Sequence, residues 1–227
     1  ASMAFSPNSE DIVLGGMNGN IIIKMKYGPN SVNQVKNYNS ETSPWKIDEV
    51  HYSNDGTKLV AITNGSLEII DVESWKLSHI LSIDNVSLKT CKMAKISSVI
   101  YCSGFDNNGG IDIITYNIDN NSVLNHQYFE YNSVWKMTIT PEGDKLAMSI
   151  RCEIGTNCIL ILDAESLIEI QKIIVTDYIP EMRMDIEYSP KCIQGVTPCV
   201  SSGKLATVSF RTLSFWSLDS DLDGWSD

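Results

Sequence analysis

Hydrophobic residues in this chain come in short runs that do not follow helical spacing. Runs rich in Ile, Val, Tyr, Thr and Ser, such as Ile21-Ile22-Ile23, are broken by Asn, Gly, Asp and Pro at intervals of about 8 to 12 residues. β-Branched and aromatic residues suit strands, whereas the breaking residues suit turns. The pattern therefore predicts an all-β chain of many short strands joined by tight turns.

An internal repeat accompanies this pattern. An apolar or aromatic residue followed by Ser or Thr and a turn occurs at Phe5-Ser6-Pro7, Tyr52-Ser53-Asn54, Ile139-Thr140-Pro141 and Tyr188-Ser189-Pro190, with a degenerate copy at Ala94-Lys95-Ile96-Ser97. A second landmark, an apolar residue followed by Asp, occurs at Ile70-Asp71, Leu162-Asp163 and Leu218-Asp219, with Tyr116-Asn117 in the degenerate unit. Successive copies of each landmark are about 46 residues apart, and such a fixed spacing is typical of a repeat architecture.

Each repeat resolves into four predicted strands. In the second unit these strands are Lys46–Ser53, Lys58–Thr63, Ser66–Val72 and Lys76–Ile83. Four strands at a period of about 40 to 50 residues predict a propeller blade. A single blade cannot bury both of its faces, so neighbouring blades must cover them, which explains apolar runs such as Ile159-Leu160-Ile161-Leu162.

The predicted fold is therefore an all-β β-propeller of four-stranded antiparallel blades. About five blades are visible, in units at about 1-43, 44-86, 87-132, 133-179 and 180-218, followed by an acidic tail at 219-227. The last blade lacks its outer strand, and such an open edge is a template for another strand. We expect residues outside 1-227 or another chain to close it; closure by a second copy of the chain would build a polymer. The first residues already read as the end of a strand, which indicates a processed mature end or a cut within a longer protein.

Two stretches resemble a known propeller repeat. Ser53–Ala61 followed by Ser66–Asp71 resembles a WD-repeat blade and is similar to the YVTN-type surface-layer propeller repeat, and Pro141–Ala147 with Leu160–Asp163 repeats the resemblance. Gly-His before the first strand and a Trp-Asp dipeptide are both missing, and the tyrosine-valine-threonine-asparagine motif survives only as Ala61-Ile62-Thr63-Asn64. The resemblance implies an interaction platform and leaves the particular function open.

Composition and charge exclude some classes of partner. Hydrophobic residues make up 43% and charged residues 20% of the 227 residues, as in an ordinary globular protein. With 28 Asp+Glu against 17 Lys+Arg the net charge is -11, so the chain would repel nucleic acid and anionic lipid. No apolar run approaches the length of a transmembrane helix, so we expect no membrane insertion.

The six cysteines fall into three close pairs along the chain. These pairs are Cys91 with Cys102, Cys152 with Cys158, and Cys192 with Cys199. Folding the first hairpin about Ile96-Ser97 places Cys91 opposite Cys102, within disulfide reach. We therefore expect three disulfides and an oxidising compartment, which makes the protein extracellular or bound at the cell surface.

The alternative is six buried thiols in an intracellular protein, since free cysteine packs well in cores. A zinc site is disfavoured because no Cys-x-x-Cys occurs and His51, His79 and His126 lie in different units. Sequons for N-glycosylation at Asn64, Asn85 and Asn120 lie at predicted strand ends or turns.

The C-terminal tail carries a candidate calcium loop. Its carboxylates alternate and are followed by glycine, as Asp219-Ser220-Asp221-Leu222-Asp223-Gly224-Trp225-Ser226-Asp227. The candidate Ca²⁺ ligands are the side chains of Asp219, Asp221, Asp223 and Asp227 and the main-chain carbonyl of Trp225. The segment resembles the calcium loops of thrombospondin type 3 repeats. The alternative is an acidic, solvated turn, since Asp219 is the repeat equivalent of Asp71.

No motif for catalysis stands out, and we expect no enzyme activity. The glycine-rich Gly15–Gly19 reads as a blade turn, and Trp45-Lys46 and Trp135-Lys136 read as ordinary packing between blades with the lysine stems directed outward. A propeller hydrolase of lactonase type would have to draw on Asp48, Glu49, His51, Asp185 and Glu187. The leading prediction is a non-enzymatic extracellular module that binds a protein partner or assembles with itself. Its two alternatives are an intracellular WD-repeat scaffold and the propeller hydrolase of lactonase type.

Overall fold

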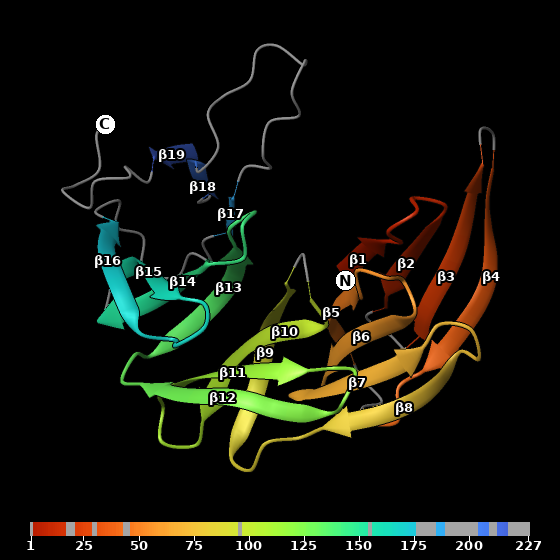
Figure 1. Cartoon of the computed structure of the whole chain (residues 1–227), viewed down its shortest axis with the longest axis horizontal. Helices are drawn as coiled ribbons and strands as arrows, with labels where there is room; N and C mark the ends of the chain where they lie inside the picture. Colours follow the sequence, from red (N-terminus) through yellow and green to blue (C-terminus); the bar gives the residue numbers. More distant parts are fainter. Residues whose placement is uncertain are drawn as a thin grey trace. The chain divides into compact units, whose positions relative to one another are not determined.

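The computed structural model describes residues 2–16, 21–28, 31–42, 46–94, 97–153, 156–175, 185–188, 204–208 and 213–217. All regular secondary structure within these ranges is β-strand (Figure 1). Two compact units, Ala1–Glu130 and Tyr131–Asp227, make up the chain. Within the described ranges there is no helix that is long and apolar enough to cross a membrane.

The first unit contains three four-stranded antiparallel sheets, which we call blades 1 to 3. Within each blade the strands pair in chain order. Blade 1 consists of β1 (Ser2–Phe5), β2 (Asp11–Gly15), β3 (Ile21–Gly28) and β4 (Ser31–Asn39). Blade 2 consists of β5 (Ile47–Tyr52), β6 (Lys58–Thr63), β7 (Ser66–Asp71) and β8 (Lys76–Leu81). Blade 3 consists of β9 (Val86–Met93), β10 (Val99–Asp106), β11 (Ile111–Asn117) and β12 (Ser122–Phe129).

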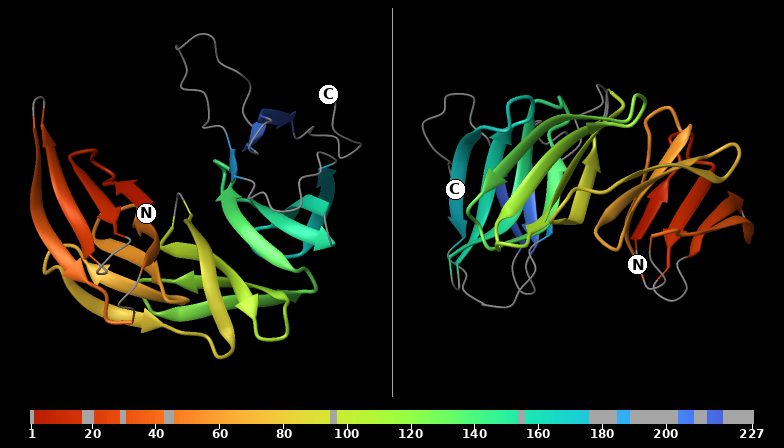
Figure 2. Two further views of the ribbon diagram at one scale, coloured as in Figure 1. Left: turned by 180° about the vertical axis from the view of Figure 1, so that it is seen from behind. Right: turned by 90° about the horizontal axis from the view of Figure 1, so that it is seen from below.

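The second unit contains the remaining two sheets (Figure 2). Blade 4 consists of β13 (Ser133–Ile139), β14 (Lys145–Glu153), β15 (Thr156–Asp163) and β16 (Glu169–Val175). Blade 5 has three strands among the described residues, β17 (Asp185–Tyr188), β18 (Lys204–Val208) and β19 (Leu213–Ser217). The predicted all-β fold of four-stranded antiparallel blades is therefore confirmed, and the residues that follow β19, where an outer strand of the last blade would lie, are outside the described ranges.

Blade 2 shows why consecutive positions of a strand are apolar and do not alternate with polar ones. Leu59 lies in a buried cluster with Val13 of blade 1, whereas its neighbour Val60 lies in a second cluster with Leu88 of blade 3. Successive side chains of a strand point to opposite faces, so a blade covered on both faces needs apolar residues at both parities. Each such side chain that is fully buried contributes about 1.5–3 kcal/mol.

The second unit repeats this packing between blades 4 and 5. Ala147, Ile159 and Ile161 of blade 4 form a buried cluster with Ile186 and Leu205 of blade 5. Short described strands in blade 5 thus still contribute side chains to a shared core.

The first repeated landmark of the sequence is a hydroxyl group that closes the turn between the first two strands of a blade. The Oγ of Ser53 accepts a hydrogen bond from the N–H of Lys58 at 2.9 Å and donates to Asp55 Oδ1 at 2.6 Å. Ser6 and Thr140 make the corresponding bonds to the N–H groups of Asp11 and Lys145. Gly56 lies in the Ser53 turn at φ 73°, a left-handed conformation that glycine adopts without strain.

The second landmark closes the turn between the third and fourth strands. Asp71 Oδ1 accepts from the N–H of Ser74 at 2.7 Å, and Asp163 Oδ1 accepts from the N–H of Ser166 at 2.8 Å. These bonds, together with those from the serine hydroxyls, lower the pKa of both aspartates. In blade 3 an asparagine, Asn117, accepts in the same way from the N–H of Asp119 at 2.9 Å. The repeat in the sequence is thus a repeat of local turn chemistry.

Candidate interaction site at the junction of blades 2 and 3

A buried carboxylate links the first strands of blades 2 and 3. Glu49 on β5 accepts a hydrogen bond from the backbone N–H of Cys91 on β9 at 2.8 Å and from Thr90 Oγ1 at 3.2 Å. His51 Nε2 lies 3.3 Å from the same carboxylate. The charge of Glu49 is therefore compensated by polar groups of a neighbouring blade, as a buried carboxylate requires.

The cysteine that bonds Glu49 belongs to a disulfide within blade 3. Cys91 on β9 and Cys102 on β10 are direct partners in the strand register, and their Cα atoms lie 4.1 Å apart. Such a short separation is typical of a non-hydrogen-bonded pair, whose N–H groups point away from each other. The N–H of Cys91 is therefore directed away from β10, where Glu49 meets it.

Cys152 and Cys158 form a second disulfide, across the turn between β14 and β15. Two of the three predicted cysteine pairs are thus confirmed, and the pair Cys192 with Cys199 lies outside the described residues. Within the described residues every cysteine is disulfide-bonded.

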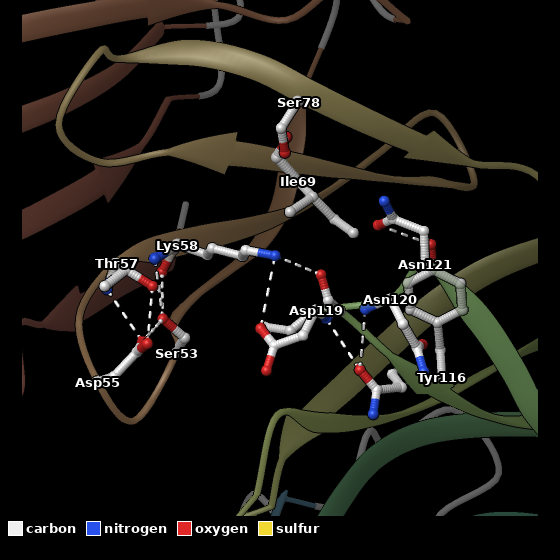
Figure 3. A network of polar contacts seen from close by, with 12 residues as sticks. Ser53, Asp55, Thr57, Lys58, Ile69, Ser78, Tyr116, Asp119, Asn120 and Asn121 are labelled. Atoms are coloured by element: carbon white, nitrogen blue, oxygen red, sulfur yellow. Dashed lines mark hydrogen bonds and ion pairs between the residues drawn. The ribbon is translucent and has the colours of Figure 1, made fainter.

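One edge of blades 2 and 3 is cross-braced by contacts between turns. Lys58 Nζ donates to the main-chain carbonyl of Ile118 at 2.6 Å and lies 3.5 Å from Asp119 Oδ1. Figure 3 shows Lys58 reaching from the Ser53 turn of blade 2 to the turn before β12. Asn54 Nδ2 also donates to the carbonyls of Ala94 and Ser97 in blade 3. We call the turns at 53–58, 71–75 and 117–121 the braced edge.

The opposite edge is organised by a second buried carboxylate. Glu68 Oε1 accepts hydrogen bonds from the N–H groups of Glu41 and Thr42 at 2.9 and 2.8 Å. The hydroxyls of Ser40 and Thr42 donate to the same oxygen at 2.8 Å, and Tyr38 Oη donates to Oε2 at 3.0 Å. Burial, and then the charge of Glu68, raises the pKa of the Tyr38 hydroxyl well above its usual value. Glu68 thus anchors the connection that leaves blade 1 to the side of blade 2.

The residues that a hydrolase would draw on lie on β5 of blade 2 and on β17 of blade 5. Asp48 forms an ion pair with Lys46, and Glu49 is committed to Cys91 and Thr90. Asp185 and Glu187 lie on β17 in the other unit, in register with Val208 and Ala206. Of the predicted pool, Glu49 and His51 lie on the same strand of blade 2, with His51 Nε2 3.3 Å from the Glu49 carboxylate.

Each of the three histidines has its own local partner. His51 lies beside Glu49, His126 Nε2 lies 2.6 Å from Asp112 Oδ1, and the ring of His79 stacks on Tyr116 with centroids 6.4 Å apart. In the part of the chain that the structure describes, no group of three or more His, Cys, Asp or Glu side chains is placed to hold a metal ion. The predicted calcium ligands Asp219, Asp221, Asp223, Trp225 and Asp227 lie outside the described residues, as does Trp45.

All three sequon asparagines are exposed and lie in turns or connections. Asn64 and Asn85 have positive φ angles of 49° and 63°, which asparagine tolerates better than most residues. Asn120 lies between β11 and β12, and its Oδ1 accepts a hydrogen bond from Ser122 Oγ at 2.6 Å. The expectation that the sequons lie at strand ends or turns is confirmed.

Glu68 and Asp112 belong to no motif in the sequence and are not among the predicted site residues. Both are buried carboxylates, with 0% and 4% of the residue surface exposed. A signal was present, because each interrupts an apolar run, at Leu67-Glu68-Ile69-Ile70 and Ile111-Asp112-Ile113-Ile114. A charged residue inside a buried strand is rarely tolerated unless it is paired, so such an interruption points to a polar network.

Comparison with known proteins places the chain among propellers without assigning it to a family. No profile of a known protein family matches the chain. Over 124 residues, 52% of this chain, it is 26% identical to a Candida glabrata protein named "Putative guanine nucleotide-exchange factor SED4", and it spans 12% of that protein's length.

Among solved structures, the chain is similar to a hydrazine synthase of Kuenenia stuttgartiensis. The TM-score is 0.68 at 12% identity, and the match covers 99% of this chain and 67% of the other. At this identity the likeness concerns the fold alone, and it supports the β-propeller fold read from the blades.

Proposed function

We propose that this chain is a protein-interaction module built from propeller blades, and that its partner is a guanine nucleotide-binding protein. The observation that carries the proposal is the match of half the chain to a protein named as an exchange factor. The module acts by binding and does not itself make or break covalent bonds, in line with the absence of a catalytic motif in its sequence.

An exchange factor needs no catalytic side chains in the usual sense. It speeds nucleotide release by binding the nucleotide-free partner more tightly than the loaded one, and the partner's affinity for nucleotide falls by the same factor. Such a role requires a surface that is rigid before binding, since less conformational freedom is then lost on association.

The braced edge of blades 2 and 3 meets this requirement and is the surface that we assign to the partner. Its turns are tied together by the bonds of Lys58 and Asn54 across the two blades. Its exposed carboxylates, among them Glu73 and Asp119, give it a negative potential that steers a basic partner surface toward it.

The test uses the full chain with a panel of small GTP-binding proteins, each loaded with a fluorescent GDP analogue. At least one of them is expected to bind the chain more tightly without nucleotide and to release the analogue faster in its presence. Glu73→Lys should weaken this binding, whereas Glu130→Lys, a matched charge reversal at the end of blade 3, should leave it unchanged. Absence of binding to every member in both nucleotide states would overturn the proposal.

A second candidate function is that of a structural module outside the cell, and the two disulfides favour it. Structural disulfides persist in oxidising compartments and are rare in the cytosol, where GTP-binding proteins act. In this reading the C-terminal loop binds Ca²⁺, and the edge of blade 5 pairs with a strand from another copy.

The two functions differ in the oxidation state of the native protein. The experiment is a thiol count on protein alkylated at the moment of lysis or harvest, with a calibrated mass before and after reduction. Six alkylated thiols would favour the first function, binding to a guanine nucleotide-binding protein inside the cell. Cysteines that react only after reduction, together with glycan mass, would favour the structural module outside the cell.

A further inference from the structure

The fourth strand of blade 3, β12, differs from the other fourth strands that the structure describes. A fourth strand has a partner on one side only, so its outer edge is open to another strand. Three of these strands carry charged residues, with Lys36 on β4, Lys76 on β8, and Glu169 and Lys172 on β16. The sequence of β12, Ser-Val-Leu-Asn-His-Gln-Tyr-Phe, contains no Asp, Glu, Lys, Arg or Pro.

Charged residues are the usual protection of an edge strand, and β12 lacks them while exposing apolar side chains. Val123 is 45% exposed, Leu124 53% and Tyr128 43%. A register shift against the third strand does not set β12 apart, since β4, β8 and β16 have one as well. Figure 1 shows β12 as the outermost strand of its sheet.

Three exposed side chains of β12 are arranged symmetrically along the strand. Val123 is in register with Tyr116, His126 with Ile114, and Tyr128 with Asp112. Positions 112, 114 and 116 are evenly spaced on β11 and share one face of the sheet. His126 is therefore the midpoint between Val123 and Tyr128 along the strand. By residue number it lies three positions from Val123 and two from Tyr128, and the register shift in β12 takes up the extra residue.

This symmetry makes the strand complementary to a second copy of itself. In an antiparallel pair related by a twofold axis through His126, Val123 of each copy lies opposite Tyr128 of the other. Aromatic side chains and β-branched side chains form favourable cross-strand pairs. The same arrangement about the middle residue of β16 would place Lys172 of one copy opposite Lys172 of the other, whereas β12 contains no Asp, Glu, Lys or Arg.

Main-chain groups of β12 are available for exchange with such a partner. The N–H of His126 donates to the side-chain oxygen of Asn125 at 2.8 Å, and the carbonyl of Tyr128 accepts from Gln127 Nε2 at 3.2 Å. Both bonds come from amide side chains on the strand itself, and a second strand can replace them.

We propose that β12 is a self-association site at which two copies of the chain pair antiparallel, edge to edge, about a twofold axis through His126. Pairing of this kind is isologous and closes at a dimer. The interface is small, so the expected dissociation constant is on the order of 10–100 µM. The proposal is independent of the partner proposed above.

The test is sedimentation equilibrium of the full chain from about 1 to 200 µM, a range set by the expected affinity. The weight-average mass should rise from 25.2 kDa toward twice that value. Val123→Lys and Tyr128→Glu should each raise the dissociation constant about tenfold. Combining the two substitutions in one chain places Lys opposite Glu at both symmetric positions and should restore association.

The control is Ile174→Lys on β16, where the isoleucine is 59% exposed and also lies on a fourth strand. This variant should associate like the wild type, and circular dichroism should show that every variant retains its β structure. A mass of 25.2 kDa at all concentrations would overturn the proposal. So would a double variant no better than the single ones, or loss of association in Ile174→Lys.

Discussion

The carboxylate of Glu49 and the backbone N–H of Cys91 belong to neighbouring blades and meet at 2.8 Å. β9 is the first strand of its sheet, so main-chain groups on its free side have no strand to bond. Glu49 supplies the missing acceptor, while the disulfide to Cys102 holds Cys91 on its other side. The contact joins two blades through one strand edge.

We predict that Glu49→Ala lowers the free energy of unfolding by about 1–3 kcal/mol, because it leaves the buried N–H of Cys91 without an acceptor. Urea denaturation of the full chain measures the change. Asp48→Ala is the control: Asp48 pairs with the exposed Lys46, and the loss of such a pair costs about 0–1 kcal/mol. Equal effects of the two variants would contradict the prediction.

Glu68→Ala is expected to be more damaging than Glu49→Ala. It removes the acceptor of five hydrogen bonds in one step, including two from backbone N–H groups of the connection at 41–42. The loss in unfolding free energy should exceed about 3 kcal/mol. Hydrogen exchange should also rise at Glu41 and Thr42 well before global unfolding; protection that stays native there would show that other contacts hold the connection.

The turn aspartates predict a dependence of stability on pH. Hydrogen bonds from Ser74 and Ser166 lower the pKa of Asp71 and Asp163 in the folded state. When the pKa of a carboxyl group is lower in the folded state than in the unfolded state, the group stabilises the protein at pH values above its unfolded-state pKa. This stabilisation disappears as the pH falls through the folded-state pKa. Unfolding free energy should therefore decrease as the pH falls below about 4.

The variant Asp71→Asn/Asp163→Asn tests this assignment, since asparagine can still accept the bonds but does not titrate. Its stability, measured by urea denaturation at several pH values, should fall less steeply in acid than that of the wild type. An unchanged slope would assign the acid sensitivity to other groups.

The two disulfides should differ in their resistance to reduction. Cys91 and Cys102 are both fully buried, at 1% and 0% exposure, whereas Cys152 is partly exposed beside the turn of its hairpin. Dithiothreitol under native conditions should open the bond between Cys152 and Cys158 first, because a thiolate must reach a sulfur atom. Alkylation followed by peptide mass spectrometry gives the order, and prior loss of the bond between Cys91 and Cys102 would contradict it.

Calcium provides a prediction for the C-terminal tail. If Asp219, Asp221 and Asp223 form a calcium loop, Ca²⁺ should raise the melting temperature of the full chain with an affinity of about 10⁻⁴–10⁻³ M. Asp221→Asn should abolish the shift, whereas Asp84→Asn, an exposed aspartate between β8 and β9, should preserve it. Equal Ca²⁺ responses in both variants would exclude the loop as the binding site.

Several features were accessible from the sequence because they are local. The Ser53 hydroxyl accepts a hydrogen bond from the N–H five positions later, and the Asp71 carboxylate accepts one from the N–H three positions later. Because both bonds close within a few residues, the residues that form them recur in the sequence of each repeat. The pairing of Cys91 with Cys102 needed only the turn of one hairpin. Turn chemistry and cysteine spacing together predicted the blades, their period and three disulfides, of which the two within the described residues are present.

Contacts between blades were decided by the tertiary structure alone. Glu49 and Cys91 are 42 positions apart, and Glu68 and Thr42 are 26 apart, so nothing in the residue order pairs them. The extra residue in β12 that makes His126 the midpoint between Val123 and Tyr128 likewise appears only in the strand register. Residue order determines which hydrogen bonds a short segment can close by itself, whereas the stacking of sheets determines which distant groups share a buried interface and must satisfy one another.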